Sequence, residues 1–295
     1  MRACVIFNPA AKGQKAERFR KLLDTISKDC ELKQTSAPGD ARLLAARAVN
    51  EGFDTIFAAG GDGTLNEVLN GIADVPDGFD RARLGVLPLG TINVFARELG
   101  IPLDPAAAWD MLRHSVERRM DLPYIETSTT ETRRFYFAQL AGAGLDARAI
   151  QLVNWPLKKK LGPLAYVVAG LKAMAESQPA ITVSDGNNVT CGQLVLIGNG
   201  KLYGGTYRIF PDADFSDGYL DVCIFPKVNW LVLFRCGLAI LCRGRLPEGS
   251  VVRLRTKSFT MTCKADIAFE VDGELAGQLP VNVRIQPGAL RVLAK

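Results

Sequence analysis

The hydrophobic positions in the first third of the chain follow two alternating periods. Short apolar runs at Ala3–Phe7, Thr55–Ala59 and Leu84–Leu87 have the length and residue types of buried strands. Between them, apolar residues recur at helical spacing, as in Phe19–Ile26 and Leu65–Ile72. This alternation predicts an α/β fold whose N-terminal domain is a doubly wound, mostly parallel sheet with helices on both faces.

The pattern changes after about residue 120, where strand-like runs separated by turn residues dominate. Helical periodicity interrupts them only near Leu164–Ala175 and Asn229–Leu241. The runs predict a mainly antiparallel second domain. They are Phe135–Leu140, Ile181–Val183, Gln193–Ile197, Tyr219–Phe225, Val251–Arg255, Phe259–Cys263, Ile267–Val271 and Val281–Ile285.

The composition limits which ligands and which catalytic groups the protein can use. The net charge of +5 suits an anionic small molecule or an anionic membrane surface, and it is too weak to indicate nucleic acid. His114 is the sole histidine, which argues against a zinc site or a Ser-His-Asp triad and leaves acid–base chemistry to carboxylates. The seven cysteines are scattered and form no C-x-x-C pair. We therefore expect buried free thiols in a reducing, cytoplasmic compartment.

No signal peptide or membrane span is expected. Asn8-Pro9 ends the first apolar run before it reaches the length of a signal sequence. The most apolar stretch, Trp230–Cys242, has about half the length of a span and contains Arg235. It predicts a buried or interfacial helix.

The strongest local signal is the turn Gly60-Gly61-Asp62-Gly63-Thr64, between a predicted strand and a predicted helix. Glycines leave the backbone open, so N–H groups at the helix start can hold phosphate oxygens. An acid inside such a turn fits a group that holds Mg²⁺ or accepts a proton beside a triphosphate. The alternative is an ordinary tight turn with Asp-Gly as turn residues.

A second glycine turn, Leu87-Pro88-Leu89-Gly90-Thr91, also follows a strand and precedes a helix that begins near Asn93. Two such turns at the carboxyl ends of parallel strands mark the place where an open α/β sheet binds its ligand. Neither turn fits the Walker A or the G-x-G-x-x-G pattern. We expect ATP to bind here.

Six segments, taken together, carry a family resemblance. They are Asn8-Pro9-Ala10-Ala11 with Lys12-Gly13, Gly39-Asp40-Ala41 after Thr35, Gly60–Val68, Leu87–Thr91 with Asn93 and Phe95-Ala96-Arg97, Asp217–Val222, and Asp272-Gly273-Glu274. Over nearly its whole length, the chain resembles the bacterial diacylglycerol kinase family, whose catalytic domain is shared with eukaryotic diacylglycerol, sphingosine and ceramide kinases. In one departure, Val94 stands where the family pattern has Asp.

The resemblance implies two domains. Residues 1–122 would form the nucleotide-binding domain, residues 123–287 a β-sandwich domain for the lipid acceptor, and a last strand within 288–295 would return to the first domain. The lipid would enter the cleft between them. The nucleotide would contact Asn8, Thr35, Gly60, Gly61, Asp62, Gly63, Thr64, Leu65, Asn66, Glu67 and Thr91.

The resemblance also implies catalytic and metal sites. Asp272 resembles the family's proton acceptor, with Asp62 as the competing candidate, although Asp272-Gly273 also fits a plain hairpin turn. A Mg²⁺ ion would be held by the carbonyl groups of Asp214 and Tyr219 and the carboxylate of Asp217. The sequence leaves open which aspartate is the base and which lipid is the acceptor.

The expected partners are ATP, a lipid acceptor and the surface of a membrane, with a homodimer left open. Trp155 precedes three lysines, Lys158, Lys159 and Lys160, a combination that suits peripheral docking on an anionic membrane and equally fits a plain solvated loop. We therefore expect a cytoplasmic lipid kinase that uses Mg²⁺ and ATP. Its rivals are an NAD kinase, and a non-catalytic protein that binds nucleotide or lipid, for which Val94 is the only support.

Overall fold

The structure is a computed structural model that describes residues 2–9, 13–127, 132–152, 164–247 and 249–295. The lysine run at Lys158–Lys160 and residues 10–12 of the opening motif lie outside the described residues.

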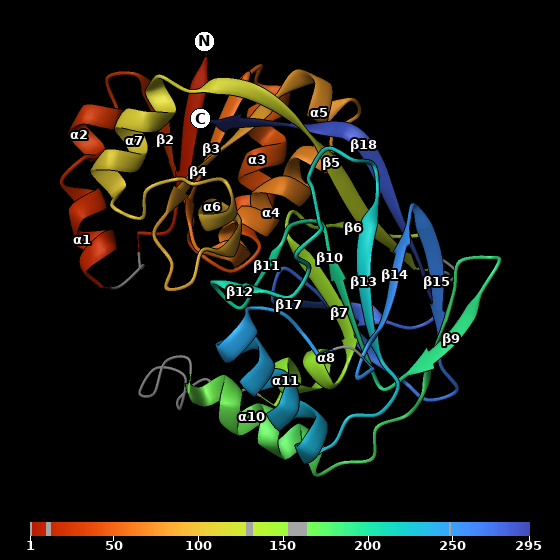
Figure 1. Ribbon diagram of the computed structural model, residues 1–295. Coiled ribbons are helices and arrows are strands. Elements are labelled where there is room, and N and C mark those ends of the chain that lie inside the picture. The colour runs from red at the N-terminus through yellow and green to blue at the C-terminus, as the bar shows by residue number, and fades with distance from the viewer. Residues whose placement is uncertain (1, 10–12, 128–131, 153–163, 248) are drawn as a thin grey trace.

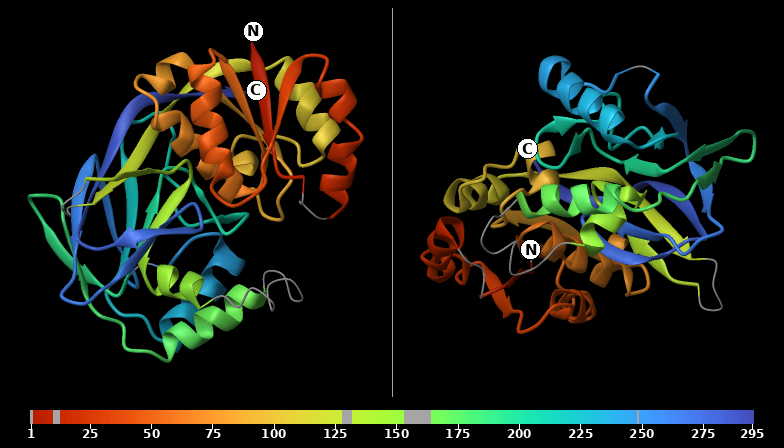
Figure 2. Two further views of the ribbon diagram at one scale, coloured as in Figure 1. Left: turned by 180° about the vertical axis from the view of Figure 1, so that it is seen from behind. Right: turned by 90° about the horizontal axis from the view of Figure 1, so that it is seen from below.

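The N-terminal domain is an α/β domain with helices on both faces of a parallel sheet (Figures 1 and 2). Its sheet has the order β2-β1-β3-β4, and every neighbouring pair is parallel. The strands are β1 (Ala3–Phe7), β2 (Cys30–Gln34), β3 (Thr55–Gly60) and β4 (Arg83–Pro88). The helices are α1 (Gln14–Arg20), α2 (Leu23–Ile26), α3 (Asp40–Asn50), α4 (Asp62–Ala73), α5 (Gly78–Arg81), α6 (Val94–Glu98) and α7 (Pro105–Arg113).

Two long strands connect the domains. β5 (Val116–Thr127) and β18 (Val281–Ala294) pair antiparallel along almost their whole length and run from one domain into the other (Figure 1). Val292 of β18 also pairs in parallel with Leu84 of β4, so the end of the chain closes the first sheet. The domain boundary expected between residues 122 and 123 falls inside β5, and the expected last strand is the end of β18.

The C-terminal domain is an antiparallel β-sandwich. One layer has the order β14-β13-β10-β7-β16-β17, and β18, β15, β8 and β9 continue the first domain's sheet over it. Its strands are β6 (Arg134–Tyr136), β7 (Leu140–Gly144), β8 (Ile181–Ser184), β9 (Val189–Gly192), β10 (Leu194–Gly198), β11 (Leu202–Tyr203), β12 (Tyr207–Arg208), β13 (Leu220–Phe225), β14 (Val252–Thr256), β15 (Ser258–Thr262), β16 (Ala268–Val271) and β17 (Glu274–Gln278). Its helices are α8 (Leu145–Gln151), α10 (Leu164–Met174) and α11 (Trp230–Arg243).

The fold class predicted from the sequence is confirmed, but two predicted elements are broken. The helical stretch Phe19–Ile26 divides into α1 and α2, because the N–H groups of Lys21 and Leu22 bond to carbonyl groups three residues back. The run Phe135–Leu140 is interrupted between β6 and β7, because the backbone N–H groups of residues 138–140 donate to a side chain, as described below.

All seven cysteines are free, but not all are buried as we expected. Cys191 and Cys242 are exposed and Cys263 is half-buried. Cys191 lies on the outer strand β9, whose alternate residues face solvent, and Cys242 lies near the end of α11. Among the described residues, no helix is long and apolar enough to cross a membrane.

Candidate active site

The predicted nucleotide residues gather at one edge of the parallel sheet. Asn8 follows β1, Thr35 follows β2, Gly60 ends β3, and Thr91 lies three residues after the end of β4. Because these strands are parallel, their carboxyl ends share one edge. Asn8 and Thr91 are exposed there, and the N–H of Thr35 is fixed by a 2.9 Å bond to the carbonyl of Phe7.

The two glycine turns pack directly against each other. The N–H of Leu89 donates to the carbonyl of Gly60 over 2.8 Å. A Cβ atom on Gly90 would lie 2.6 Å from Cα of Gly61, so a larger residue would force the turns apart. Asn93 holds Gly90 from the other side, accepting from its N–H at 3.0 Å and donating to its carbonyl at 2.7 Å. The turns therefore form one rigid backbone unit.

Asp62 joins the start of α4 to the start of α6. Its Oδ1 atom accepts a 2.9 Å bond from the N–H of Val94, so this carboxylate caps the short helix α6. Burial and, second, the negative charge of Asp272 raise the pKa of Asp62 to about 6, against the opposing N–H groups of residues 93–95. The departure at Val94 thus leaves its backbone bond to Asp62 intact.

Asp272 is at once a turn residue and a buried anion. Asp272-Gly273 connects β16 to β17 as a two-residue hairpin turn, with φ of +48° at Asp272 and +87° at Gly273. Its side chain nevertheless faces inward, where Oδ1 accepts from the N–H groups of Gln139 (2.9 Å) and Leu140 (3.1 Å). Its Oδ2 accepts from the N–H of Ala138 at 2.8 Å and from Nδ2 of Asn66 at 3.0 Å.

These four partners decide the charge of Asp272. Burial raises its pKa, and the N–H donors oppose that rise. All four bonding partners are donors, so a proton on this carboxyl group would have no acceptor to face. We therefore treat Asp272 as a carboxylate.

A chain of asparagines fixes the contact between the domains. The N–H of Tyr136 donates to Oδ1 of Asn70 at 3.0 Å, and Nδ2 of Asn70 donates to Oδ1 of Asn66 at 3.1 Å. These two bonds orient the amide of Asn66 so that its Nδ2 points to Asp272. Both asparagines are buried on α4, one turn apart, and they connect the nucleotide helix to the second domain.

A second pair of acids, the buried Glu270 and the half-buried Asp146, lies close to the Asp272 turn. Oδ2 of Asp146 and Oε1 of Glu270 both stand over Gly142, where a Cβ atom would lie 2.7 Å and 3.0 Å from them. Burial raises the pKa of both groups. The hydroxyl of Tyr203 donates to Asp146 at 2.7 Å and the N–H of Gly273 donates to Glu270 at 2.7 Å. This geometry fits a pair that shares one proton.

Cationic groups lie at the second glycine turn. Nζ of Lys15, on α1, donates to the carbonyl of Gly90 at 3.1 Å, and Nε of Arg97, on α6, donates to the carbonyl of Ile92 at 2.7 Å. Burial, followed by the charge of Arg97, lowers the pKa of Lys15. Two positive charges beside an open glycine turn suit the phosphates of a nucleotide.

Leu65 and Glu67 of the first motif face other parts of the protein, and Glu274 of the second domain approaches the motif at Gly63. The side chain of Leu65 is buried in the core of the first domain. The carboxylate of Glu67 accepts from the N–H groups of Gly39 (3.0 Å) and Ala41 (3.1 Å), which ties the start of α3 to α4. Glu274 approaches the turn from the second domain, because a Cβ atom on Gly63 would lie 2.8 Å from its Oε1.

Of the three groups expected to bind Mg²⁺, the Asp217 carboxylate already has protein partners. It accepts from the N–H of Tyr219 at 2.8 Å and is paired with the guanidinium of Arg255. The side chain of Asp214, whose backbone carbonyl was the expected ligand, accepts from the N–H and hydroxyl of Ser216 at 2.9 Å and 2.7 Å. Among the described residues, no three His, Cys, Asp or Glu side chains are grouped for metal binding. We derive no catalytic step through a metal at this place.

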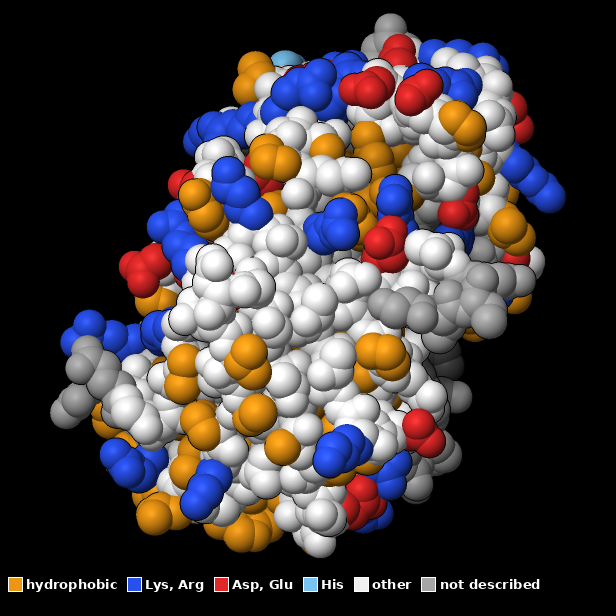
Figure 3. All heavy atoms as spheres, turned by 90° about the vertical axis from the view of Figure 1, so that its right-hand side faces the viewer, with side chains coloured by type: hydrophobic (Ala, Val, Ile, Leu, Met, Phe, Trp, Pro, Cys, Tyr) orange, Lys and Arg blue, Asp and Glu red, His pale blue; other side chains and the backbone are white. Residues whose placement is uncertain are grey.

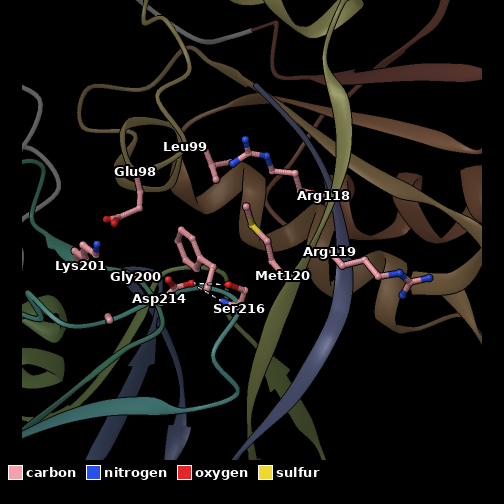
Figure 4. Close-up of a pocket in the computed structure, with 11 residues that line it drawn as sticks. Glu98, Leu99, Arg118, Arg119, Met120, Gly200, Lys201, Asp214 and Ser216 are labelled. Atoms are coloured by element: carbon pink, nitrogen blue, oxygen red, sulfur yellow. Dashed lines mark hydrogen bonds between the residues drawn. The ribbon is translucent and has the colours of Figure 1, made fainter.

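The junction of the domains also holds an open cavity of about 430 Å³. Figure 4 shows the side chain of Arg118 extending into the cavity toward Leu99. Glu98 and Lys201 lie at the left of the cavity, and the side chain of Arg119 points away from it. None of the predicted nucleotide residues lines this cavity, so it is distinct from the glycine turns.

Several of these residues were not foreseen. The sequence does mark Asn70, because Asn66 and Asn70 lie one helical turn apart and interrupt an apolar helix face. Lys15, Asp146 and Glu270 had none, because each becomes significant only through residues distant in the sequence.

Comparison with known proteins agrees with this geometry. The family model "Diacylglycerol kinase catalytic domain" matches residues 2–125, and "YegS C-terminal NAD kinase beta sandwich-like domain" matches residues 139–294.

Whole proteins match over nearly the full chain. Two proteins named diacylglycerol kinase, from Staphylococcus aureus strains bovine RF122 / ET3-1 and MRSA252, are each 32% identical to it over 291 residues, which cover 95% of this chain and 88% of theirs. The crystal structure of a diacylglycerol kinase from Bacillus anthracis strain Sterne has a similar fold, with a TM-score of 0.78 at 22% identity over 100% of this chain and 97% of that one. The chain belongs to the diacylglycerol kinase family.

Proposed function

We propose that this chain is an ATP-dependent lipid kinase, which transfers the γ-phosphate of Mg-ATP to a lipid hydroxyl group. The observation that carries this proposal is that the start of α4, which holds Asp62, lies against the hairpin turn that holds Asp272, since Asn66 bonds to Asp272 and Glu274 approaches Gly63. Asp62 belongs to the glycine turn and Asp272 to the β-sandwich, and the charge of Asp272 raises the pKa of Asp62. A phosphoryl donor held by the first domain would therefore lie beside an acceptor held by the second.

The nucleotide phosphates would lie over the paired glycine turns. The open backbone at Gly61 and Gly63 offers N–H groups, and the start of α4 favours negative charge. Lys15 and Arg97 would add positive charge beside the second turn. Mg²⁺ would arrive as part of the nucleotide substrate, bridging its phosphate oxygens.

We assign the proton transfer to Asp62. The lipid hydroxyl oxygen forms a bond to the γ-phosphorus as the bond from that phosphorus to the β–γ bridging oxygen breaks, and ADP leaves with the electron pair. The hydroxyl proton passes to Oδ2 of Asp62, the oxygen that does not accept from Val94. A pKa of about 6 suits a base that works near neutral pH.

Asp272 would then act on Asp62 and Asn66 rather than on the acceptor directly. Four donors occupy its oxygens, and only 8% of the residue is exposed. Its fixed negative charge raises the proton affinity of Asp62 and holds Asn66 in place. Catalysis in this scheme is mainly positioning and electrostatic stabilisation, as expected for phosphoryl transfer.

Diacylglycerol, or a related lipid, is the acceptor that we propose. The two S. aureus proteins are named for this substrate, and their similarity extends through both domains. The test is to incubate the protein with γ-labelled ATP and a mixed lipid extract and to identify the labelled lipid by mass spectrometry. A labelled phosphatidate supports the proposal. Labelled NADP in a parallel incubation with NAD, or ATP binding without any labelled product, would replace it with an NAD kinase or a non-catalytic nucleotide-binding protein.

A further inference from the structure

Helix α11 exposes an apolar face to solvent. Trp230, Leu231, Phe234 and Leu238 are 57%, 66%, 69% and 51% exposed. Their spacing of one, four and eight residues places them on one side of the helix. Large apolar residues that are grouped on an exposed face mark an interaction surface more often than isolated ones do. We call these four residues the α11 apolar face.

The opposite side of α11 fixes the orientation of the helix. Cys236 is buried in a hydrophobic cluster, and Val232, Leu233 and Ile240 pack against it. Ala173 of α10 belongs to the same cluster, so both helices lie on one core at the end of the second domain (Figure 1). The α11 apolar face therefore points outward because the other face of the helix is already packed.

The charged residues of α11 and its flanking turns are basic. Between Asp221 and Glu248, the sequence contains Lys227, Arg235, Arg243 and Arg245 and no acid. Lys227, Arg235 and Arg245 are exposed. Figure 3 shows the side of the molecule that lies on the right in Figure 1, and its lower part carries scattered apolar side chains with Lys, Arg and a few Asp or Glu among them. An exposed apolar helix face with exposed basic side chains beside it is complementary to an anionic lipid bilayer.

We propose that α11 docks this protein on an anionic lipid bilayer. The α11 apolar face would enter the boundary between headgroups and acyl chains, with Trp230 at the headgroup level. Lys227, Arg235 and Arg245 would face anionic headgroups. This inference rests on the proposed function, because a kinase whose acceptor resides in a bilayer must meet the bilayer. A second copy of the chain is a poorer occupant, since it would bring the same positive charges together.

Vesicle co-sedimentation tests the docking. The variant is Trp230→Ser with Phe234→Ser, and the matched control is Leu43→Ser with Val189→Ser. The control residues are 58% and 69% exposed on α3 and β9, so both variants remove equally exposed apolar groups. Wild type and control should sediment with phosphatidylglycerol-containing vesicles and much less with pure phosphatidylcholine. The α11 variant should bind at least about tenfold more weakly.

Three results would overturn the docking. They are equal binding by the α11 variant and the control, equal binding to neutral and anionic vesicles, and a lipid-free dimer of the wild type that the α11 variant abolishes. Sedimentation velocity without lipid detects the dimer. Thermal unfolding of both variants should match wild type, because all four side chains are exposed.

Kinase assays separate this inference from the proposed function. With a short-chain acceptor dispersed below its micelle concentration, the α11 variant should turn over at the wild-type rate. With acceptor embedded in anionic vesicles, its KM should rise about tenfold or more while kcat stays unchanged. Vesicle binding through α11 without any lipid phosphorylation would refute the proposed function alone. If lipid is phosphorylated and the KM for acceptor in vesicles is the same for wild type and the α11 variant, only the docking is refuted.

Discussion

Nδ2 of Asn66 donates a 3.0 Å hydrogen bond to Oδ2 of Asp272, across 206 residues of sequence. Asn66 belongs to the helix that follows the first glycine turn, and Asp272 belongs to a hairpin turn of the β-sandwich. The bond therefore joins the nucleotide side of the molecule to the acceptor side.

Asp272→Asn should destabilise the protein. The asparagine would place an amide N–H₂ group against backbone N–H donors, so at least one buried donor would lose its acceptor. We expect the free energy of unfolding to fall by roughly 1–3 kcal/mol in chemical denaturation. Asp266→Asn, at an exposed aspartate of the same domain, is the control and should change little. Equal stability of the two variants would mean that Asp272 is only a turn residue.

Asp62→Asn should abolish turnover while the fold remains. The asparagine Oδ1 can still accept from Val94 but cannot take the hydroxyl proton, so kcat should fall by about 10²–10⁴-fold. In the wild type, kcat/KM should decrease as the pH falls below about 6, because Asp62 becomes protonated. A folded variant with near-normal turnover would remove Asp62 from the mechanism.

Asp62→Asn should also stabilise the protein above pH 6. The pKa of Asp62 is about 6 in the folded state and 3.8 in its ordinary environment, so the folded state binds more protons between these values. Stability therefore falls as the pH rises from about 4 to 6, and the loss persists above 6. Asparagine does not ionise, so the free energy of unfolding of Asp62→Asn should exceed that of the wild type at pH 8 by on the order of 1–3 kcal/mol. At pH 4 the two proteins should have similar free energies of unfolding. Denaturation curves at both pH values measure this; a less stable variant at pH 8 would contradict it.

Gly90→Ala should weaken ATP binding. Its Cβ atom would lie 2.6 Å from Cα of Gly61, so the two glycine turns would separate. We expect the Kd for ATP in calorimetric titration to rise about tenfold or more, an energy of about 1.4 kcal/mol. Gly237→Ala is the matched control, because this helical glycine has open space around its Cβ position. An unchanged affinity of Gly90→Ala for ATP would show that binding of the nucleotide phosphates does not depend on the packing of the two turns.

Removal of divalent cations should leave the nucleotide-free protein unchanged. Arg255 already neutralises the Asp217 carboxylate that we expected to hold Mg²⁺. The Tm measured by calorimetry in EDTA should therefore equal the Tm in excess Mg²⁺, whereas turnover should require Mg²⁺ as part of Mg-ATP. A Tm that rises with Mg²⁺ in the absence of nucleotide would restore a resident metal site at residues 214–219.

The sequence was sufficient for the parts of this molecule that local patterns determine. The apolar runs placed β1, β3 and β4, and the glycine turns followed them as predicted. The sequence was insufficient where a distant partner decides the conformation. The strand expected through Phe135–Leu140 breaks because three of its N–H groups bond to Asp272, more than 130 residues away.

The candidate site shows the same division. The family motifs identified Asp62 and Asp272, but they did not show that four donors surround Asp272 or that burial raises the pKa of both acids. The approach of Asp146 and Glu270 over Gly142 depends on two elements that the sequence does not bring together. The domain limits at residues 1–122 and 123–287 remain our proposal, since β5 and β18 run through both parts.

Transfer of phosphate to a lipid hydroxyl with Asp62 as the proton acceptor is tested by the stoichiometry of the reaction with a defined acceptor. The protein is incubated with γ-labelled ATP, Mg²⁺ and diacylglycerol in mixed micelles, and ADP and labelled phosphatidate are quantified together for wild type and Asp62→Asn. We expect equal amounts of ADP and phosphatidate with the wild type, and a loss of both by about 10²-fold or more with the variant. ADP formed without labelled lipid, or phosphatidate formed equally well by Asp62→Asn, would contradict this expectation.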